Sequence, residues 1–455
     1  MLSVLKHRIF RHLFAAQVIA ITGTGLATVA LGLIAYDLAG ADASVVLGIA
    51  LTIKMVSYVT LAPIAAALAS QYPRRRWLVT LDILRALVAL ALPFVSEIWQ
   101  IYVLIFVMQA SSAGFTPAFQ ATIPDVLPDE EDYTNALSLS RLAFDIESLL
   151  SPALAALLLT VVAANTLFFG TAIGFIASAF LVVSVALPSP KVSTTKGFYA
   201  RTTIGVRIYL KTPRLRGLLG LSASAAAVSA VVIINTVVII RADLGLSAHM
   251  VALALASFGA GSMCAALALP RVLAQQPDRP VMIAGAVIAI AAQTSLAAYA
   301  GLSTLTLLAV LVCWFLSGLG YSTILTPAGR LLKRSTHAAD RPAAFAAQFT
   351  LSHGCWLITY PLAGWSMSRF GMVPSLLMLN GFAALGLLYA WRQWPANMPQ
   401  NLPHSHPELA ADHPHLQETP DQTDTSPHRH AHPIIIDELH RSYPSYPPQH
   451  RLQDS

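Results

Sequence analysis

The sequence predicts an all-α integral membrane protein, with twelve transmembrane helices as two six-helix bundles and a disordered C-terminal tail. Of its 455 residues, 56% are hydrophobic and only 11% are charged, whereas soluble domains carry about 25% charged residues. Apolar runs of the length that spans a bilayer recur along the chain, and basic residues collect in alternate loops. These observations argue against an ordinary soluble enzyme.

The apolar runs fall into two sets of six. The first set lies at 12–37, 43–69, 77–95, 98–123, 136–163 and 165–187, and the second at 217–240, 247–269, 280–300, 304–328, 342–367 and 374–394. Two sets of spans joined by a polar linker are the layout of two packed repeats. We therefore expect an N-terminal bundle at 1–187, a basic cytoplasmic linker at 188–216 and a C-terminal bundle at 217–394.

The basic residues give the expected orientation. With a cytoplasmic N-terminus, the inside segments hold 20 Lys and Arg, and the outside loops hold only Arg241 and Arg369. This asymmetry follows the positive-inside rule and supports twelve spans with both termini in the cytoplasm. The net charge of +6 then reflects insertion into the lipid bilayer, and we expect no nucleic-acid partner. We expect a monomer.

The tail, residues 395–455, is rich in Pro and His and holds nine of the fourteen histidines. Several follow a His-x-His spacing, which places residues i and i+2 on one side of an extended chain. Imidazole nitrogen suits Ni²⁺, Co²⁺, Cu²⁺ and Zn²⁺, so these histidines predict binding of a divalent metal ion; the alternative is a soluble linker without a metal role. The candidate metal ligands are His404, His406, His413, His415, His428, His430 and His432.

Ionisable residues inside predicted spans are functional candidates, because each costs on the order of 3 kcal/mol at membrane depth. Lys54 lies midway along the second span, and Asp145 and Glu147 lie in the fifth. One reading is that an acidic residue, preferably Glu147, alternately binds a proton and the cargo. The other is a structural ion pair between Lys54 and Asp145 or Glu147, which we favour for Lys54.

Four further residues are candidate cavity ligands. His353 and Cys355 lie midway along the eleventh span, and Gln17 and Gln109 lie in the first and fourth. Their alternative role is a hydrogen bond that packs membrane helices together. Residues that are two positions apart lie on different faces of a helix, so the side chains of His353 and Cys355 are not expected to point the same way.

Several segments resemble the major facilitator superfamily, in particular its drug- and siderophore-exporter branch of proton-driven antiporters. The loop between the second and third spans reads Ala-Ala-Leu-Ala-Ser-Gln-Tyr-Pro-Arg-Arg over 66–75, with Ser70 and Gln71 where the family usually has Asp and Arg. Asp82 and Arg85 resemble the Asp-x-x-Arg that follows in this branch, and 115–152 resembles its fourth and fifth helices. The resemblance implies roles in transport or proton coupling for Asp82 and Arg85.

One subgroup of this exporter branch resembles the chain in two further features. The first span, with Arg-His-Leu-Phe-Ala-Ala-Gln over 11–17, and the His-rich tail are similar to bacterial nickel-resistance exporters. This resemblance implies a bacterial inner-membrane protein that exports Ni²⁺, and in some cases Co²⁺, against a proton gradient, with no enzymatic activity and no cofactor. The alternative is an exporter of an organic molecule (a drug, macrolide or siderophore) with an incidental tail. A metal-sensing receptor ranks third, because no signalling motif is present.

Overall fold

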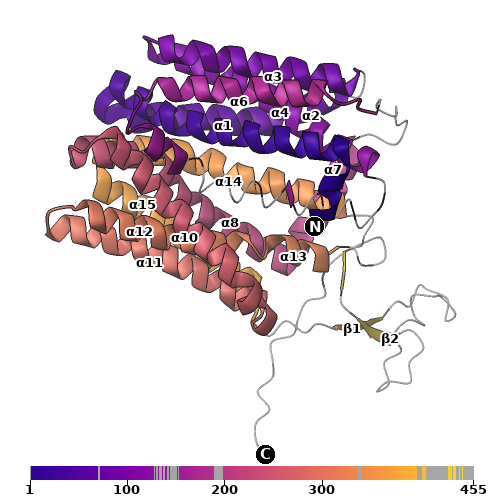
Figure 1. Ribbon diagram of the computed structural model, residues 1–455. Helices are drawn as coiled ribbons and strands as arrows, with labels where there is room; N and C mark the ends of the chain where they lie inside the picture. Colours follow the sequence, from indigo (N-terminus) through magenta and orange to yellow (C-terminus); the bar gives the residue numbers. More distant parts are fainter. Residues whose placement is uncertain are drawn as a thin grey trace, which may run out of the picture. The chain divides into compact units, whose positions relative to one another are not determined.

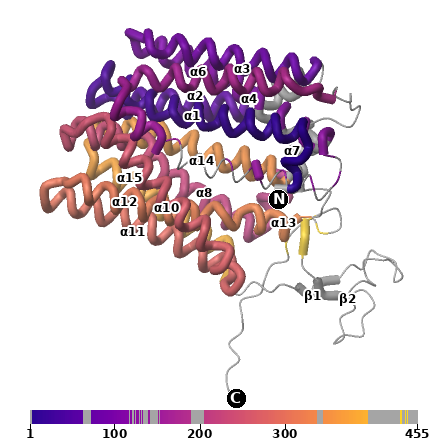
Figure 2. The backbone as a smooth tube through the Cα atoms, in the orientation of Figure 1, coloured from indigo at the N-terminus to yellow at the C-terminus, as the bar shows by residue number. Residues whose placement is uncertain are grey.

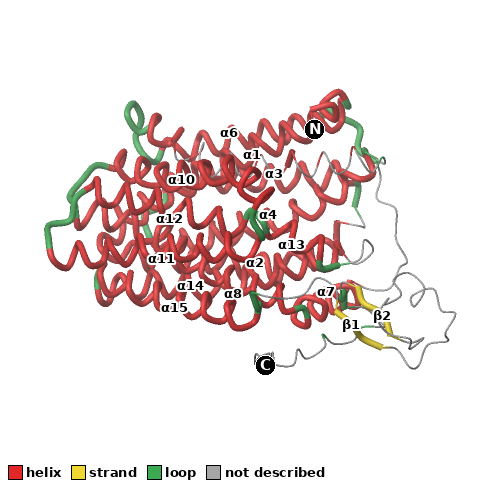
Figure 3. The backbone as a smooth tube through the Cα atoms, turned by 90° about the horizontal axis from the view of Figure 1, so that it is seen from below, coloured by secondary structure: helices red, strands yellow, loops and turns green. Residues whose placement is uncertain are grey.

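Helices make up nearly all of the described chain (Figure 3). The computed structural model describes residues 2–69, 72–127, 153–188, 198–336, 341–396, 402–405, 429–432 and 434–436, with single residues between 128 and 152 and at 440 and 443. The chain forms two compact units. The larger comprises 1–196, 221–327 and 350–387, and the smaller comprises 197–220, 328–349 and 388–455.

The first half of the chain supplies five long helices. After the short η1 (Leu2–Lys6), these are α1 (Arg8–Ala39), α2 (Ala43–Ala69), α3 (Arg74–Ala91), α4 (Ile98–Val126) and α6 (Thr166–Val183). Two short helices, η2 (Gly40–Asp42) and η3 (Leu92–Phe94), lie at the ends of α1 and α3. The helices confirm these predicted spans to within a few residues, and much of the first half of the fifth span, including 144–150, lies outside the described residues.

The second half of the chain supplies six long helices. Its long helices are α8 (Pro213–Ala230), α10 (Ala248–Gln275), α11 (Asp278–Leu302), α12 (Leu307–Leu325), α14 (Arg341–Phe370) and α15 (Met372–Gln393). The seventh span continues beyond α8 through η4 (Val231–Asn235), α9 (Thr236–Val238) and η5 (Ile239–Asp243). Both η4 and η5 are π-helical turns, which occur frequently at functional sites.

Nine helical segments of the described chain are long and apolar enough to cross a membrane, and one of them, Arg8–Leu61, contains both α1 and most of α2. The helix α14 is not among the nine. It carries Ser352, His353 and Ser366 along its length. A membrane helix with this many polar residues is expected to face other helices or an internal site rather than lipid.

Within the larger unit, helices distant in sequence lie side by side (Figures 1 and 2). In the first half, α6 packs between α1 and α3, and α4 packs against α2 and α3. In the second half, α12 packs against both α10 and α11. Close packing of this kind is how membrane helices associate, since lipid tails are as apolar as the side chains they contact.

The closest of these helix contacts joins α10 and α12 through glycine. A Cβ atom on Gly318 would lie 1.9 Å from the carbonyl oxygen of Phe258, and one on Gly261 would lie 1.8 Å from that of Phe315. No side chain fits at these two positions unless the backbones separate. Glycine therefore sets the distance between α10 and α12.

The smaller unit gathers α7 (Phe198–Lys211), α13 (Ala328–Arg334) and the ends of three longer helices. The linker that the sequence predicts only as a basic polar stretch thus contains a helix. The Tyr209 hydroxyl donates to Gln348, and Arg214 donates to the carbonyl of Arg334 at 2.8 Å. These bonds tie α7 to α14 and α8 to α13.

The sequence predicts a disordered tail, but two parts of it that the structure describes are ordered. The strands β1 (Leu402–Ser405) and β2 (Arg429–His432) pair antiparallel. Ile434 and Ile436 are each 1% exposed, so they bury apolar side chains that composition alone does not reveal. Nearby, burial raises the pKa of the Tyr443 phenol above its ordinary value, and the Arg214 guanidinium partly opposes this. This part of the tail therefore packs within the smaller unit, near the start of α8.

We expect Gly318→Ala to destabilise the protein by about 1–3 kcal/mol, because the added methyl group forces α10 and α12 apart. The measurement is the thermal unfolding midpoint of the purified protein in detergent. The matched control is Gly301→Ala on α11, where a Cβ meets no atom within 4 Å. Equal midpoints for the two variants would show that the glycine contact does not set the helix spacing.

Candidate functional site

The two halves of the chain touch where α2 and α14 cross in the larger unit. A Cβ atom on Gly364 would lie 2.3 Å from the carbonyl oxygen of Ser44, and one on Gly48 would lie 2.9 Å from that of Tyr360. These residues lie near the helix ends opposite to the N-terminus, which we call the distal end. At the distal end, the two halves are in backbone contact.

Polar contacts reinforce this crossing. The Ser44 hydroxyl donates to the carbonyl of Ile234 at 3.4 Å, and the Ser368 hydroxyl donates to the carboxylate of Asp42. Ile234 lies in the π-helical turn η4. Because π-helical turns disturb the regular i→i−4 bonding, they can leave a carbonyl free for an outside donor.

Two further contacts join the halves at the distal end. A ring nitrogen of His249 donates to the carbonyl of Ala156 at 2.7 Å. The Arg241 guanidinium lies over the ring of Tyr36, 5.0 Å from its centroid. Together with the crossing of α2 and α14, these contacts hold the distal end closed.

A cluster of polar and aromatic side chains lies further along α2 and α14. The Lys54 ammonium lies 5.9 Å from the Tyr58 ring centroid. The Tyr58 ring meets His353 of α14 edge-on at 6.1 Å, and His353 lies 5.7 Å from Trp356. The Trp356 indole donates to the hydroxyl of Ser229 on α8 at 3.0 Å. We call these five residues the central cluster.

The central cluster lies near the middle of α2, the depth expected for the middle of the membrane. Along α2, Lys54 and Tyr58 follow Gly48 by six and ten residues, which corresponds to roughly 9 and 15 Å from the crossing. The hydrocarbon core is about 30 Å thick. Lys54, Tyr58, His353 and Trp356 are all partly exposed, so each retains surface for a bound molecule.

The other candidate ligands of α14 do not join His353. The Cys355 thiol donates to the carbonyl of Leu351 at 3.5 Å and is buried, in line with the different faces expected for residues two apart. Gln348 accepts a hydrogen bond from Tyr209 in the smaller unit. The structure therefore joins His353 to aromatic residues rather than to a second metal-binding side chain among the described contacts.

Gln17 of α1 and Gln109 of α4 are both buried. Within the described chain, the Gln17 carbonyl oxygen has no hydrogen-bond partner. A buried amide oxygen without a partner is costly, so Gln17 stays a candidate for contact with a bound molecule. No contact joins it to Gln109 in the part of the chain described here.

Asp82 and Arg85 form a buried ion pair on α3. The Ser178 hydroxyl of α6 donates to Asp82 at 2.8 Å. The Arg85 guanidinium lies between the rings of Phe115 and Phe175, 4.2 and 4.6 Å from their centroids. The pair thus joins α3, α4 and α6 within the first half of the chain.

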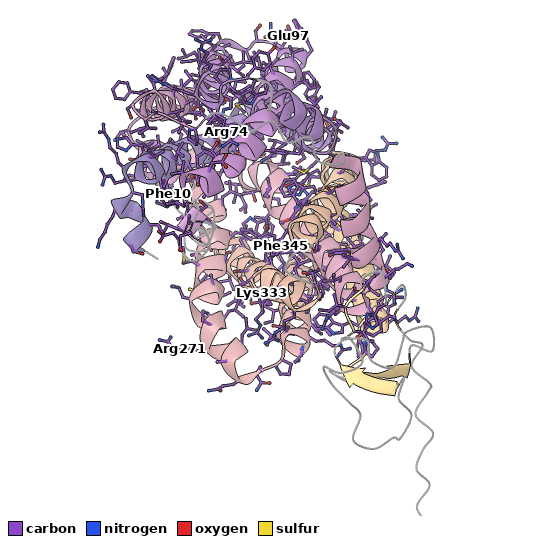
Figure 4. The ribbon with its side chains drawn as sticks, turned by 90° about the vertical axis from the view of Figure 1, so that its right-hand side faces the viewer. Phe10, Arg74, Glu97, Arg271, Lys333 and Phe345 are labelled. Carbon is purple, nitrogen blue, oxygen red and sulfur yellow. The ribbon has the colours of Figure 1, made fainter. Side chains whose placement is uncertain are left out.

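The loop after α2 retains one charge pair, although Ser70 and Gln71 replace the family's Asp and Arg. The Arg74 guanidinium at the start of α3 (labelled in Figure 4) forms an ion pair with Asp125 near the end of α4. Exposed pairs of this kind contribute about 0–1 kcal/mol. The pair therefore positions the ends of α3 and α4 more than it stabilises them.

Several predicted site residues lie outside the described residues. These are Asp145, Glu147, His406, His413, His415 and His428. Among the tail histidines on the strands, His404 lies directly opposite His430 in the β1–β2 register, and His432 lies opposite Leu402. No group of three or more His, Cys, Asp or Glu side chains that could hold a metal ion occurs among the described residues.

The sequence did not single out Tyr58, Trp356 or Ser229. Aromatic and hydroxyl residues are ordinary in membrane helices, so composition does not mark them. The sequence does show that Lys54 and Tyr58 share one helix face, as do His353 and Trp356, since residues three or four apart lie on the same face. The sequence pattern does not predict that α2 packs against α14, which brings the two pairs of residues together.

Two helical halves that meet at one end, with a polar cluster midway along the helices that join them, are the arrangement expected of a secondary transporter. The Major Facilitator Superfamily matches residues 13–234 and again 217–420. The chain belongs to this superfamily, and it is a transporter and not an enzyme.

Among curated proteins, the chain is 29% identical over 124 residues to the uncharacterized MFS-type transporter YfiS of Bacillus subtilis, covering 27% of this chain and 30% of that protein. It is 24% identical over 184 residues to macrolide efflux protein A of Streptococcus pyogenes, covering 39% and 45%. The chain thus spans less than half the length of the curated relatives it matches.

Solved structures show the same fold. A bacterial homologue of the human lysosomal transporter Spinster, in an inward-facing and unoccupied conformation, matches with a TM-score of 0.68 at 13% identity, covering 86% of this chain and 99% of the other. The D-xylose-proton symporter also matches with a TM-score of 0.68, at 14% identity and with 86% and 98% coverage. At these identities, the matches establish the fold alone.

We expect Asp82→Asn to destabilise the protein by about 3–5 kcal/mol, because it leaves the buried Arg85 charge without a counter-ion. The double variant Asp82→Leu/Arg85→Met removes both charges and is expected to recover most of that stability. Thermal unfolding in detergent measures both effects. If Asp82→Asn unfolds like the wild type yet loses transport, the pair serves proton coupling rather than structure.

Proposed function

We propose that the chain is a proton-coupled secondary exporter of an organic molecule. The observation that carries this proposal is the distal contact between α2 and α14, with the central cluster on the same two helices roughly 15 Å away. A site between two halves that are joined at one end suits alternating access. The similarity to macrolide efflux proteins supports an organic cargo.

In this proposal, opening of the distal end releases the cargo and admits a proton. The distal contacts are few and mostly polar or between small residues, so they can separate without exposing a large apolar surface. An acidic residue of the fifth span, Glu147 or Asp145, carries the proton. A carboxylic acid at membrane depth can be neutral when protonated and regain its charge on release, which suits it to exchange a proton for the cargo.

The test is uptake of labelled erythromycin into inside-out membrane vesicles under an imposed proton gradient. Wild-type protein is expected to accumulate erythromycin or at least one other organic probe, and a protonophore is expected to abolish the accumulation. Gly364→Ala is expected to lower the rate at least about five-fold, because a methyl group 2.3 Å from the Ser44 carbonyl opposes closure of the distal end by about 1–3 kcal/mol.

The matched control is Gly381→Ala on α15, where a Cβ meets no atom within 4 Å, and it is expected to transport like the wild type. A panel of neutral and charged organic probes accompanies erythromycin. Failure of energised vesicles to accumulate any of them would reject the proposed function. Equal transport rates for the two glycine variants would show that the distal crossing does not affect transport.

A second candidate function is efflux of Ni²⁺ or Co²⁺, and one observation favours it. The β1–β2 register places His404 opposite His430, and residues directly opposite in an antiparallel pair have Cβ atoms about 4.5–5.5 Å apart. Imidazole ligands suit both ions. Against this candidate, the curated relatives include macrolide efflux proteins, and the central cluster is mainly aromatic.

For this candidate, proton-driven uptake of labelled Ni²⁺ into inside-out vesicles is the expected result. The paired variant His404→Ala/His430→Ala is expected to bind Ni²⁺ about ten-fold more weakly in equilibrium dialysis, a typical cost of losing a metal-site contact. The control is His450→Ala, a histidine of the same tail. Vesicles that accumulate erythromycin but no Ni²⁺ would exclude the metal as cargo.

A further inference from the structure

Lys54 carries a positive charge at mid-depth of the membrane without a described counter-ion. The ion pairs of the described chain involve Arg74, Arg85 and His7, and none includes Lys54. Asp82 is already paired with Arg85, so it does not balance this charge. A charge at this depth is costly unless something of opposite charge meets it.

One aromatic ring lies beside this charge, and two more extend away from it. The ammonium of Lys54 lies over Tyr58, whose ring meets His353 edge-on, and the His353 ring lies tilted beside that of Trp356. The hydrogen bond from the Trp356 indole to Ser229 at 3.0 Å fixes the orientation of that ring. The result is a row of rings that begins at a cation on the first half and ends on the second half.

Such a row is suited to a planar molecule. Flat conjugated rings stack on aromatic side chains or meet them edge-on, with centroids about 4.5–7 Å apart. Without Lys54, the negative faces of these rings would also attract a cationic cargo. Here Lys54 already occupies the face of Tyr58, so a second cation would be repelled, whereas an anion would supply a counter-charge that no described residue provides.

The geometry points to the central cluster as a binding site for a planar aromatic organic anion. In this inference, the Lys54 ammonium pairs with the anionic group of the cargo, and Tyr58, His353 and Trp356 hold its rings. The inference rests on the proposed function and names the substrate class of the same site. Neither Tyr58 nor Trp356 is charged, so Lys54 is the residue that decides between an anion and a cation.

The experiment uses two xanthene dyes of similar size and opposite charge, carboxyfluorescein and rhodamine 123. Their uptake into energised inside-out vesicles is compared for the wild type, Lys54→Gln, Lys54→Arg and Trp356→Leu. Wild-type protein is expected to accumulate carboxyfluorescein in preference to rhodamine 123. Lys54→Gln is expected to lower carboxyfluorescein uptake about ten-fold, the effect of losing one charge-assisted contact, and Lys54→Arg is expected to retain it.

The matched control is Lys333→Gln, an exposed lysine of α13, which is expected to leave uptake of both dyes unchanged. Trp356→Leu is expected to lower uptake of both dyes, because it removes a ring without changing charge. Because Lys54→Arg keeps the charge, its retained uptake distinguishes loss of charge from failure to fold.

Three results would overturn the inference. Preferential accumulation of rhodamine 123, with no loss in Lys54→Gln, would identify a cationic cargo while the proposed function stands. Recovery of the thermal unfolding midpoint of Lys54→Gln by a second substitution, Glu147→Gln or Asp145→Asn, would show that Lys54 pairs with a carboxylate of its own chain. Absence of uptake of both dyes and of erythromycin would reject the proposed function, and the inference with it.

Discussion

In the hydrocarbon core of a bilayer there is no water to hydrogen-bond a free peptide group, and each unsatisfied group costs several kcal/mol. The described chain meets this constraint with helices along its long apolar stretches. The π-helical turn η4, where the α-helix is interrupted, also finds a partner for its peptide group. The π-helical turn η4 offers the carbonyl of Ile234, and the hydroxyl of Ser44 from the other half occupies it. The irregular turn thus becomes a contact between halves.

The same environment determines how helices associate. Because lipid supplies no hydrophobic drive between helices, contacts depend on close approach and on polar groups. Glycine permits backbone contact both inside one half, at Gly318, and between halves, at Gly364. The two contacts have different consequences. The first makes α10 and α12 a fixed pair, whereas the second joins surfaces that an alternating transporter must separate, and small residues with a few polar bonds suit that requirement.

Among the described residues, charged side chains within the spans occur in two kinds of surroundings. Asp82 and Arg85 neutralise each other on one helix, and Ser178 with two aromatic rings completes their surroundings. This buried set leaves no surface for a cargo. Lys54 instead keeps exposed surface beside the partly exposed rings of Tyr58 and His353. The contrast between a satisfied pair and an open cation supports separate roles, one structural and one in binding.

The sequence by itself determined the spans, because a run of about 20 apolar residues is a local property. It also placed Lys54 and His353 at mid-depth. Only the tertiary structure decided that these two residues share one cluster and that Ile434 and Ile436 are buried. The physical reason is that such contacts depend on how each helix is rotated and how closely its neighbours approach, and these follow from packing between segments far apart in the chain.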